Sequence, residues 1–188
     1  MRKTFIREQD LLEDSYRLAA AIYASGFRPD FIVGVWRGGS SVGIYVQECL
    51  QYLGVATDHI AIRTSYRGME SYLRGVDRPE DIRVHGLKYL YETMNRDDAL
   101  LIVDDVFSSG QNVDTVIRRL ESKTKRNMPQ DVRIAVPFYK PARNRTSRTP
   151  DYYLHETDDW LVLPYEIQGL TPAEIREHKP WLVPILKA

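Results

Sequence analysis

The sequence predicts an α/β fold in which a central parallel sheet is flanked by helices. Apolar runs of strand length alternate along the chain with stretches whose apolar residues recur at helical spacing. One of these runs, residues 100–104, does not alternate between apolar and polar positions, which is typical of a central parallel strand covered on both faces. Ligands of such sheets bind at the carboxyl ends of the strands, so polar residues that follow a predicted strand are candidates for a site.

Composition limits the classes of protein to which the chain can belong. Its 188 residues suit a single domain, 1–188, with one substantial core. Lys and Arg together number 26, as do Asp and Glu, so the net charge is zero and neither nucleic acid nor a membrane surface is an expected partner. The single cysteine, Cys49, excludes an internal disulfide and a cysteine-rich zinc site, and its apolar helical surroundings predict a buried structural thiol. The sequence shows no signal peptide or membrane-spanning run, so cytoplasmic residence is expected.

The first expected element is a helix that begins near Asp10. Asp10 followed by Glu13 resembles a capping box, and apolar residues continue at helical spacing as far as Tyr23. Gly26 stands where a left-handed C-cap would end this helix.

A strand at 31–36 and a second helix, which runs to about residue 53, are expected next. Between them lies a glycine-bearing corner, Arg37-Gly38-Gly39-Ser40. Two successive glycines let main-chain N–H groups approach an anion closely, although a glycine corner between a strand and a helix can also be an ordinary turn.

The next predicted strand, 59–63, leads into a long polar stretch at 64–98 that contains one short helix near 87–94. A segment of this length between strands is more typical of a lid or a binding loop than of a passive connection.

The most informative stretch runs from Leu100 to Asn112. The apolar strand ends in two acids, Asp104 and Asp105, and a short loop with serines and a glycine leads into a helix from Gln111 to about Leu120. Free N–H groups at a helix start favour a phosphate, and paired carboxylates suit sugar hydroxyls or a hard cation such as Mg²⁺. The pattern indicates a site for a phosphorylated sugar. It is not a P-loop, because no Gly-Lys-Ser/Thr follows, and it is not a dinucleotide fingerprint, because it has one glycine.

Strand and helix patterns continue in the last third of the chain. A strand at 132–139 is followed by a basic loop at 140–148 and by two short strands at 152–156 and 160–163. A last helix is expected to run from Thr171, which begins a capping box with proline at the first helical position, to His178.

These residues resemble the type I phosphoribosyltransferases, and most closely the purine enzymes that act on xanthine, guanine or hypoxanthine. The family signature of an apolar strand, two acids, a Ser/Thr-Gly loop and a helix matches Leu100–Asn112, and Arg37-Gly38-Gly39 resembles the pyrophosphate loop. That loop carries a cis peptide in the family, for which Trp36–Arg37 is the candidate here. Ser65 and Tyr66 resemble the start of the flexible catalytic loop.

The resemblance divides the single domain into parts with different tasks. It implies a core of about 5–140, a flexible loop of about 64–86, and a small C-terminal hood of about 140–170 that binds the purine. Within the hood, Lys140-Pro141-Ala142 and the segment 159–166 resemble the family's purine-recognition residues.

The resemblance also implies roles for single residues. Asp104 and Asp105 would hold the ribose hydroxyls of phosphoribosyl pyrophosphate (PRPP), directly or through Mg²⁺, and Glu166 would help to hold a second Mg²⁺. The pyrophosphate would bind at Arg37, Gly38 and Gly39, and Arg37 counts with the two acids as catalytic. The 5′-phosphate would lie against Ser108, Ser109, Gly110, Gln111 and Asn112. The purine would contact Lys140 at its 6-oxo group, Trp160 by stacking, and Leu161 and Val162, the latter through main-chain groups.

The expected activity is purine salvage by a Mg²⁺-dependent phosphoribosyltransferase. PRPP and a 6-oxopurine (hypoxanthine, guanine or xanthine) would give a nucleoside monophosphate and pyrophosphate, and a homodimer is expected. Displacement of pyrophosphate passes through a transition state with oxocarbenium character, and a closing loop would exclude water.

One residue departs from the family pattern. The 6-oxopurine enzymes usually carry an aspartate, which handles a proton at N7, where this chain has Ser108. Serine cannot act as an anionic base, so another acid or water takes its place, or the preferred base differs, or catalysis is slow. Two alternatives therefore stay open: a non-catalytic regulator of the same fold that senses PRPP or a nucleotide, and a phosphoribosyltransferase for another base.

Two other kinds of site are not expected. The four histidines, at positions 59, 85, 155 and 178, lack the spacing of metal ligands, and the serine pairs have no nearby His–Asp arrangement typical of a hydrolase.

Overall fold

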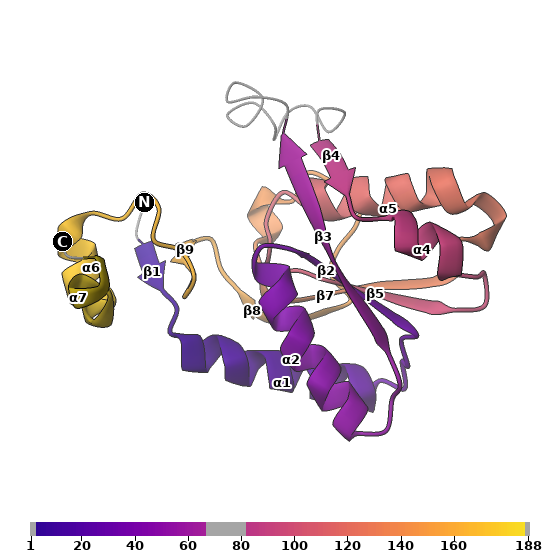
Figure 1. Cartoon of the computed structure of the whole chain (residues 1–188), viewed down its shortest axis with the longest axis horizontal. Coiled ribbons are helices and arrows are strands. Elements are labelled where there is room, and N and C mark those ends of the chain that lie inside the picture. Colours follow the sequence, from indigo (N-terminus) through magenta and orange to yellow (C-terminus); the bar gives the residue numbers. More distant parts are fainter. Residues whose placement is uncertain (1–2, 67–81, 187–188) are drawn as a thin grey trace.

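The computed structural model describes residues 3–66 and 82–186. Its main sheet has the strand order β4-β3-β2-β5-β7-β6, and β8 also pairs with β7 (Figure 1). Neighbouring strands are parallel except for β3 and β4, which are antiparallel. A second sheet joins β1 to β9 in parallel. The strands are β1 (Lys3–Phe5), β2 (Phe31–Trp36), β3 (Asp58–Tyr66), β4 (Ile82–His85), β5 (Ala99–Val103), β6 (Val106–Phe107), β7 (Asp131–Tyr139), β8 (Tyr152–Glu156) and β9 (Trp160–Val162).

Helices cover both faces of the main sheet, and β5 shows why this matters for its sequence. Leu101 packs into a core with residues of α1 and α2, whereas Leu100 and Ile102 pack on the opposite face with residues of α4 and α5. Every residue of such a strand faces a helix layer, which confirms the expected parallel α/β architecture. The helices are α1 (Glu8–Ala24), α2 (Gly38–Tyr52), α4 (Lys88–Thr93), α5 (Gln111–Thr124), α6 (Pro172–His178) and α7 (Val183–Leu186), with short 3-10 turns at Lys125–Asn127, Pro141–Arg143 and Pro180–Leu182.

Two details of the predicted N-terminal half are wrong. The first helix begins at Glu8 rather than near Asp10, because the Asp10 carboxylate binds the Arg7 guanidinium at 2.6 and 2.8 Å instead of capping a helix end. Cys49 is half-buried against the core, not fully buried, and burial raises the pKa of its thiol.

A separate group of elements lies at one end of the main sheet, on the left of Figure 1. It differs from the expected hood of about 140–170, because it includes β1 and continues to residue 186; from here on, hood means β1, β9 and residues 163–186. The two ends of the chain meet here, since β1 lies beside β9 and Lys3 Nζ binds Glu174 Oε1 at 2.6 Å. The predicted capping box at the start of α6 is confirmed, because the Thr171 and Glu174 side chains each accept the other residue's backbone N–H.

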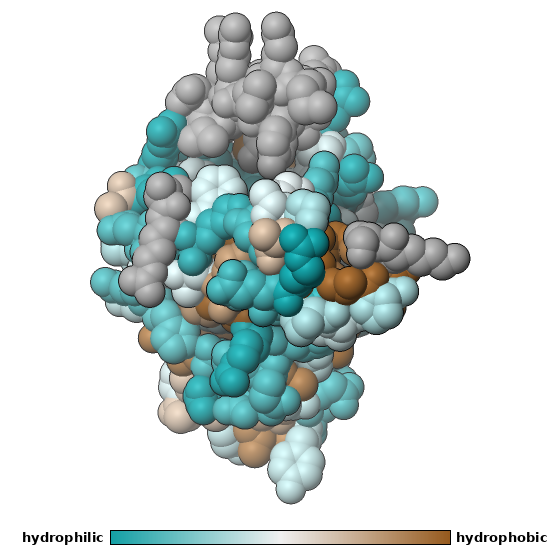
Figure 2. All heavy atoms as spheres, turned by 90° about the vertical axis from the view of Figure 1, so that its left-hand side faces the viewer, coloured by the Kyte–Doolittle hydropathy of each residue, from teal (hydrophilic) through white to brown (hydrophobic). Residues whose placement is uncertain are grey.

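The surface of this end of the molecule is mostly hydrophilic, with one group of hydrophobic side chains at its edge (Figure 2). Exposed apolar residues of the hood include Trp181, Ile185 and Leu186. None of the helices in the described ranges has the length and apolar character needed to cross a membrane.

Candidate functional site

The site is built where the glycine corner after β2 meets the acidic corner after β5. A Cβ atom on Gly38 would lie 1.6 Å from Asp105 Oδ2, and one on Gly39 would lie 2.4 Å from the Val103 carbonyl oxygen. Only glycine fits at such distances, so the two corners are in direct contact. The peptide bond between Trp36 and Arg37 is cis, which confirms the expectation for this bond.

The two acids at the end of β5 lie in different surroundings. Burial raises the pKa of Asp104 well above its ordinary value, the neighbouring charge of Asp105 raises it further, and a hydrogen bond from the Gly39 backbone acts in the opposite direction. Asp105 accepts the Val106 N–H at 2.7 Å on Oδ1 and the Tyr165 hydroxyl on Oδ2. Among the described residues neither carboxylate forms an ion pair, and no group of three or more His, Cys, Asp or Glu side chains is arranged to hold a metal ion. The pair is therefore suited to a ligand that supplies positive charge or hydroxyl donors.

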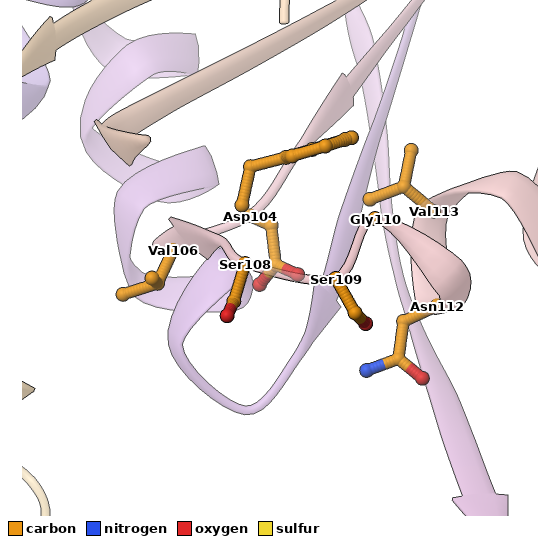
Figure 3. Close-up of a pocket in the computed structure, with 8 residues that line it drawn as sticks. Asp104, Val106, Ser108, Ser109, Gly110, Asn112 and Val113 are labelled. Carbon is orange, nitrogen blue, oxygen red and sulfur yellow. The ribbon is translucent and has the colours of Figure 1, made fainter. Parts of the chain in front are cut away.

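A small cavity of about 60 Å³ lies between this acidic corner and the start of α5. The side chains of Ser108, Ser109 and Asn112 point to the same side of the loop (Figure 3). Gly110 has a φ of +74°, and a Cβ there would lie 2.6 Å from the ring of Phe107, so glycine is required. Hydroxyls, an amide and a helix start are the groups that bind a phosphate without cationic side chains. The lining residues are Asp104, Val106, Phe107, Ser108, Ser109, Gly110, Asn112 and Val113, whereas the predicted contact Gln111 is buried and does not line the cavity.

A larger cavity of about 280 Å³ lies between the acidic corner and the hood. It is lined by Asp105, Val106, Ser108, Lys140, Arg143, Trp160, Leu161, Leu163, Tyr165 and Glu166. We call it the base cavity, because it contains three of the four predicted purine contacts.

Lys140 lies deep in the wall of the base cavity. Its Nζ donates to the carbonyl oxygen of Asp159, and burial lowers the pKa of its ammonium group, which the charge of Arg143 lowers further. The indole of Trp160 is about half exposed and free to meet a flat ligand. Val162 differs from the expectation, since it is buried outside the lining and its carbonyl accepts the Ile6 N–H at 2.9 Å.

Two residues that the sequence analysis did not assign connect the hood to the acids. The Tyr165 hydroxyl binds Asp105, its ring lies 5.8 Å from Cζ of Arg37, and burial raises the pKa of this phenol. Lys179 is buried, and its Nζ donates to the carbonyl oxygens of Leu163 at 3.2 Å and Pro164 at 2.6 Å. Lys179 thus holds the segment from which Tyr165 and Glu166 project. No local sequence pattern predicts that a lysine will hold a distant segment through its carbonyl oxygens.

Glu166 lines the base cavity beside Tyr165. Its Oε2 accepts the Leu163 N–H at 3.0 Å, and its own N–H donates to the Leu163 carbonyl at 3.0 Å. The carboxylate is therefore held at the edge of the cavity by a tight turn.

The predicted flexible loop is only partly described by the structure. Ser65 and Tyr66 are not the beginning of a loop, because β3 continues through Tyr66 and pairs with β4. Ser65 Oγ lies 3.1 Å from Nε2 of His85 on the partner strand. Residues 82–85 of the expected loop 64–86 form the strand β4, whereas residues 67–81 lie outside the described residues.

Comparison with known proteins identifies the family. The model of the phosphoribosyl transferase domain matches residues 4–168. The chain belongs to this family. The resemblance to type I phosphoribosyltransferases is thereby confirmed, and with it the fold.

Solved structures of the same fold cover most of the chain. The purine phosphoribosyltransferase of Pyrococcus horikoshii has 24% identity and a TM-score of 0.66, over 91% of this chain and 99% of that one. A hypothetical protein of Neisseria gonorrhoeae with bound ppGpp has 19% identity and a TM-score of 0.68, over 95% and 94%. The xanthine-guanine-hypoxanthine phosphoribosyltransferase of Helicobacter pylori has 16% identity and a TM-score of 0.64, over 88% and 95%. A search of curated proteins gave no match.

Proposed function

We propose that this phosphoribosyltransferase is a purine salvage enzyme that transfers the ribose 5-phosphate of PRPP to a 6-oxopurine. Hypoxanthine, guanine and xanthine are the candidate bases, and the products are a nucleoside monophosphate and pyrophosphate. The contact of Gly38, Asp105 and Tyr165 carries this proposal, because it joins the pyrophosphate corner, the sugar acids and the base cavity in one place. Several solved purine phosphoribosyltransferases share the fold, which supports the choice of base class.

The residues present fit a Mg²⁺ ion. Asp104 and Asp105 offer carboxylate oxygens, the ligands that this hard cation prefers, and a bound cation would favour the charged form of Asp104, whose pKa is raised by burial and by the charge of Asp105. Glu166, at the edge of the base cavity, would help to hold a second Mg²⁺. When bound, Mg²⁺ would neutralise charge on the departing pyrophosphate.

The chain's own residues would bind PRPP at both of its ends. Arg37 and the amides of Gly38 and Gly39 would contact the pyrophosphate, and the loop from Ser108 to Asn112 would contact the 5′-phosphate through hydroxyls and the α5 amides. Asp104 and Asp105 would accept hydrogen bonds from the ribose hydroxyls between these two anchors.

The base would enter the cavity on the hood side. Lys140 would donate to its 6-oxo group, and stacking on Trp160 would contribute roughly 1–3 kcal/mol. As the bond from N9 to the anomeric carbon forms, the bond from that carbon to the pyrophosphate oxygen breaks, and the oxygen leaves with the electron pair. A neutral base also gives its imidazole-ring N–H proton to water or to an acid of the site. Positive charge that develops on the sugar lies near Asp105, which is already fixed by Tyr165 and Val106.

A second candidate function is a non-catalytic sensor of PRPP or a nucleotide. Ser108, which cannot accept a proton as a carboxylate would, favours it, and the Neisseria gonorrhoeae protein of the same fold binds ppGpp.

Pyrophosphate release from PRPP and Mg²⁺, measured with a panel of free bases, separates the two candidates. The proposed enzyme releases pyrophosphate only when a 6-oxopurine is present. Tight PRPP binding in calorimetry, with no release for any base, would favour the sensor instead. Sedimentation of the same samples would test the homodimer that we propose for the active form.

A further inference from the structure

The lining of the base cavity contains two cationic and two acidic side chains. Burial lowers the pKa of Lys140, and the charge of Arg143 lowers it further, so these two cations lie close together in the cavity wall. The acids Asp105 and Glu166 flank Tyr165 on the side of the sugar corner. Asp158 and Asp159 also face Lys140 and act against the lowering of its pKa, but neither lines the cavity. The lining therefore offers a ligand both cations, Lys140 and Arg143, and carboxylates, Asp105 and Glu166.

Among the described residues of the lining, only Asp105 and Glu166 carry carboxylates, and both are held by hydrogen bonds on the side of the sugar corner. Asp105 accepts hydrogen bonds from Tyr165 and Val106, and Glu166 accepts one from Leu163. Ser108 lies in the lining, where a carboxylate would be needed to take a proton from the purine ring. In the described part of the chain, the cavity therefore offers two cations to the base and a serine, not a carboxylate, at position 108.

The proton balance of the reaction shows which base suits such a cavity. A neutral purine must lose a ring N–H proton to an acceptor when its N9 bonds to the anomeric carbon. A purine that binds as its anion attacks with an existing electron pair, the pyrophosphate leaves with the electrons of the broken C–O bond, and no proton moves. A second oxo group on the ring makes a 6-oxopurine more acidic, and two nearby cations stabilise its anion in a partly desolvated site.

We propose that the base cavity selects a purine with two oxo groups, of which xanthine is the simplest, bound as its monoanion. Arg143 is the specificity-determining residue, because it adds a second cation next to the lysine that contacts the 6-oxo group. This inference rests on the proposed function and narrows its substrate class.

The test compares bases in the pyrophosphate-release assay. We expect kcat/KM for xanthine to exceed that for hypoxanthine by about tenfold or more near pH 8. Between about pH 6 and about pH 9, the xanthine rate should rise with the ionisation of the base itself, whereas the hypoxanthine rate should not. Equal rates for the two bases, or a preference for hypoxanthine or guanine, would overturn the inference and leave the proposed function standing. No release with any base would remove both.

A charge-removing variant tests the role of Arg143. Arg143→Gln should reduce the ratio of xanthine to hypoxanthine kcat/KM by about fivefold or more, and Arg143→Lys should restore part of it. Arg145→Gln is the matched control, since this neighbour belongs to the same basic loop and does not line the cavity; the ratio should stay as in the parent protein. If the two glutamine variants change the ratio equally, Arg143 has no specific role.

The reciprocal variant restores a carboxylate at position 108. Ser108→Asp should raise kcat/KM for hypoxanthine and lower it for xanthine, because the new acid accepts a proton from a neutral base and repels an anionic one. Ser108→Asn, of the same size without the charge, should not invert the preference. An equal change for both bases in Ser108→Asp would contradict the proton argument.

Discussion

The sheet side and the hood side of the site are assembled in different ways. On the sheet side, two loops that follow the neighbouring strands β2 and β5 meet by direct contact of Gly38 with Asp105. On the hood side, the wall of the base cavity depends on β1, β9 and Lys179, which come from opposite ends of the chain. The half of the site proposed to bind the sugar phosphate is therefore positioned by the main core. The half proposed to bind the base is positioned by a few polar contacts outside that core.

The largest effect should come from the sheet side. Asp105→Asn removes the charge placed beside the developing positive charge of the sugar, so kcat should fall by roughly 10²–10³-fold while the melting temperature changes little. Asp97→Asn, an exposed acid remote from the site, is the control. Undiminished turnover in Asp105→Asn would refute the role assigned to this residue.

A smaller effect, confined to the base, should follow from a change in the hood. Lys179→Met removes the side-chain donor of the Pro164 carbonyl and leaves the Leu163 carbonyl with the Glu166 N–H, at a cost of about 1–3 kcal/mol, and loosens the segment that carries Tyr165. We expect KM for the base to rise by about tenfold and KM for PRPP to change by less than about twofold.

Two further variants make that prediction specific. Lys179→Arg should recover part of the affinity for the base, and the exposed Lys123→Met should behave as the parent. An equal rise of both KM values would show that the two halves are not separately held.

The sheet side should also show a conflict between function and stability. The folded state raises the pKa of Asp104 above its ordinary value of 3.8. This group therefore destabilises the ligand-free protein increasingly as the pH rises from its ordinary pKa to its raised pKa in the folded state. Asp104→Asn should therefore raise the melting temperature at pH 7, by about 2–4 °C for each kcal/mol gained in the free energy of unfolding. The same variant should abolish Mg²⁺-dependent turnover.

The pH dependence gives the check on this prediction. Thermal unfolding followed by circular dichroism should show that the gain of Asp104→Asn shrinks as the pH falls and disappears below the ordinary pKa of the carboxyl. A gain of the same size at low pH would assign the stabilisation to packing rather than to charge.

The smallest effect should come from the contact between β1 and the turn before β9. Thr4 Oγ1 donates to Asp159 Oδ2 at 2.8 Å, and the Asp159 carbonyl in turn accepts the Lys140 ammonium. Thr4→Val should cost about 0.5–1.5 kcal/mol and raise KM for the base by less than about threefold. Calorimetry and base titration measure both quantities, and Thr4→Ser should keep the parent values. A larger effect on PRPP than on the base would contradict the assignment of β1 to the hood.

The difference between the sheet side and the hood side also explains which features could be predicted from the sequence. The strands β2, β5 and β7 and both corners were predictable, because buried apolar runs and residues close together in the chain carry their signals. The strand β1 has three residues, and its pairing with β9 spans nearly the whole chain, so no local pattern announces it. The capping-box interpretation of Asp10 failed because the sequence does not show that Arg7 competes for its carboxylate.

The site residues differ in the same way, because only those that lie in local motifs were predictable from the sequence. Asp104, Asp105 and Gly38 lie in motifs, whereas Tyr165 and Lys179 act through contacts that only the folded chain creates. Lys179 also lies beyond residues 4–168, the part that the family model matches. A residue of this kind is found by asking which buried ammonium groups hold a segment that carries site residues.

The meeting of β1 with β9 has a consequence for synthesis on the ribosome. The strand β1 leaves the exit tunnel more than 150 residues before its partner β9. If the proposed function holds, the nascent protein can form the two corners proposed to bind PRPP before the wall of the base cavity exists. A premature stop after β7 would then leave a polypeptide with both corners and without the wall proposed to select the base.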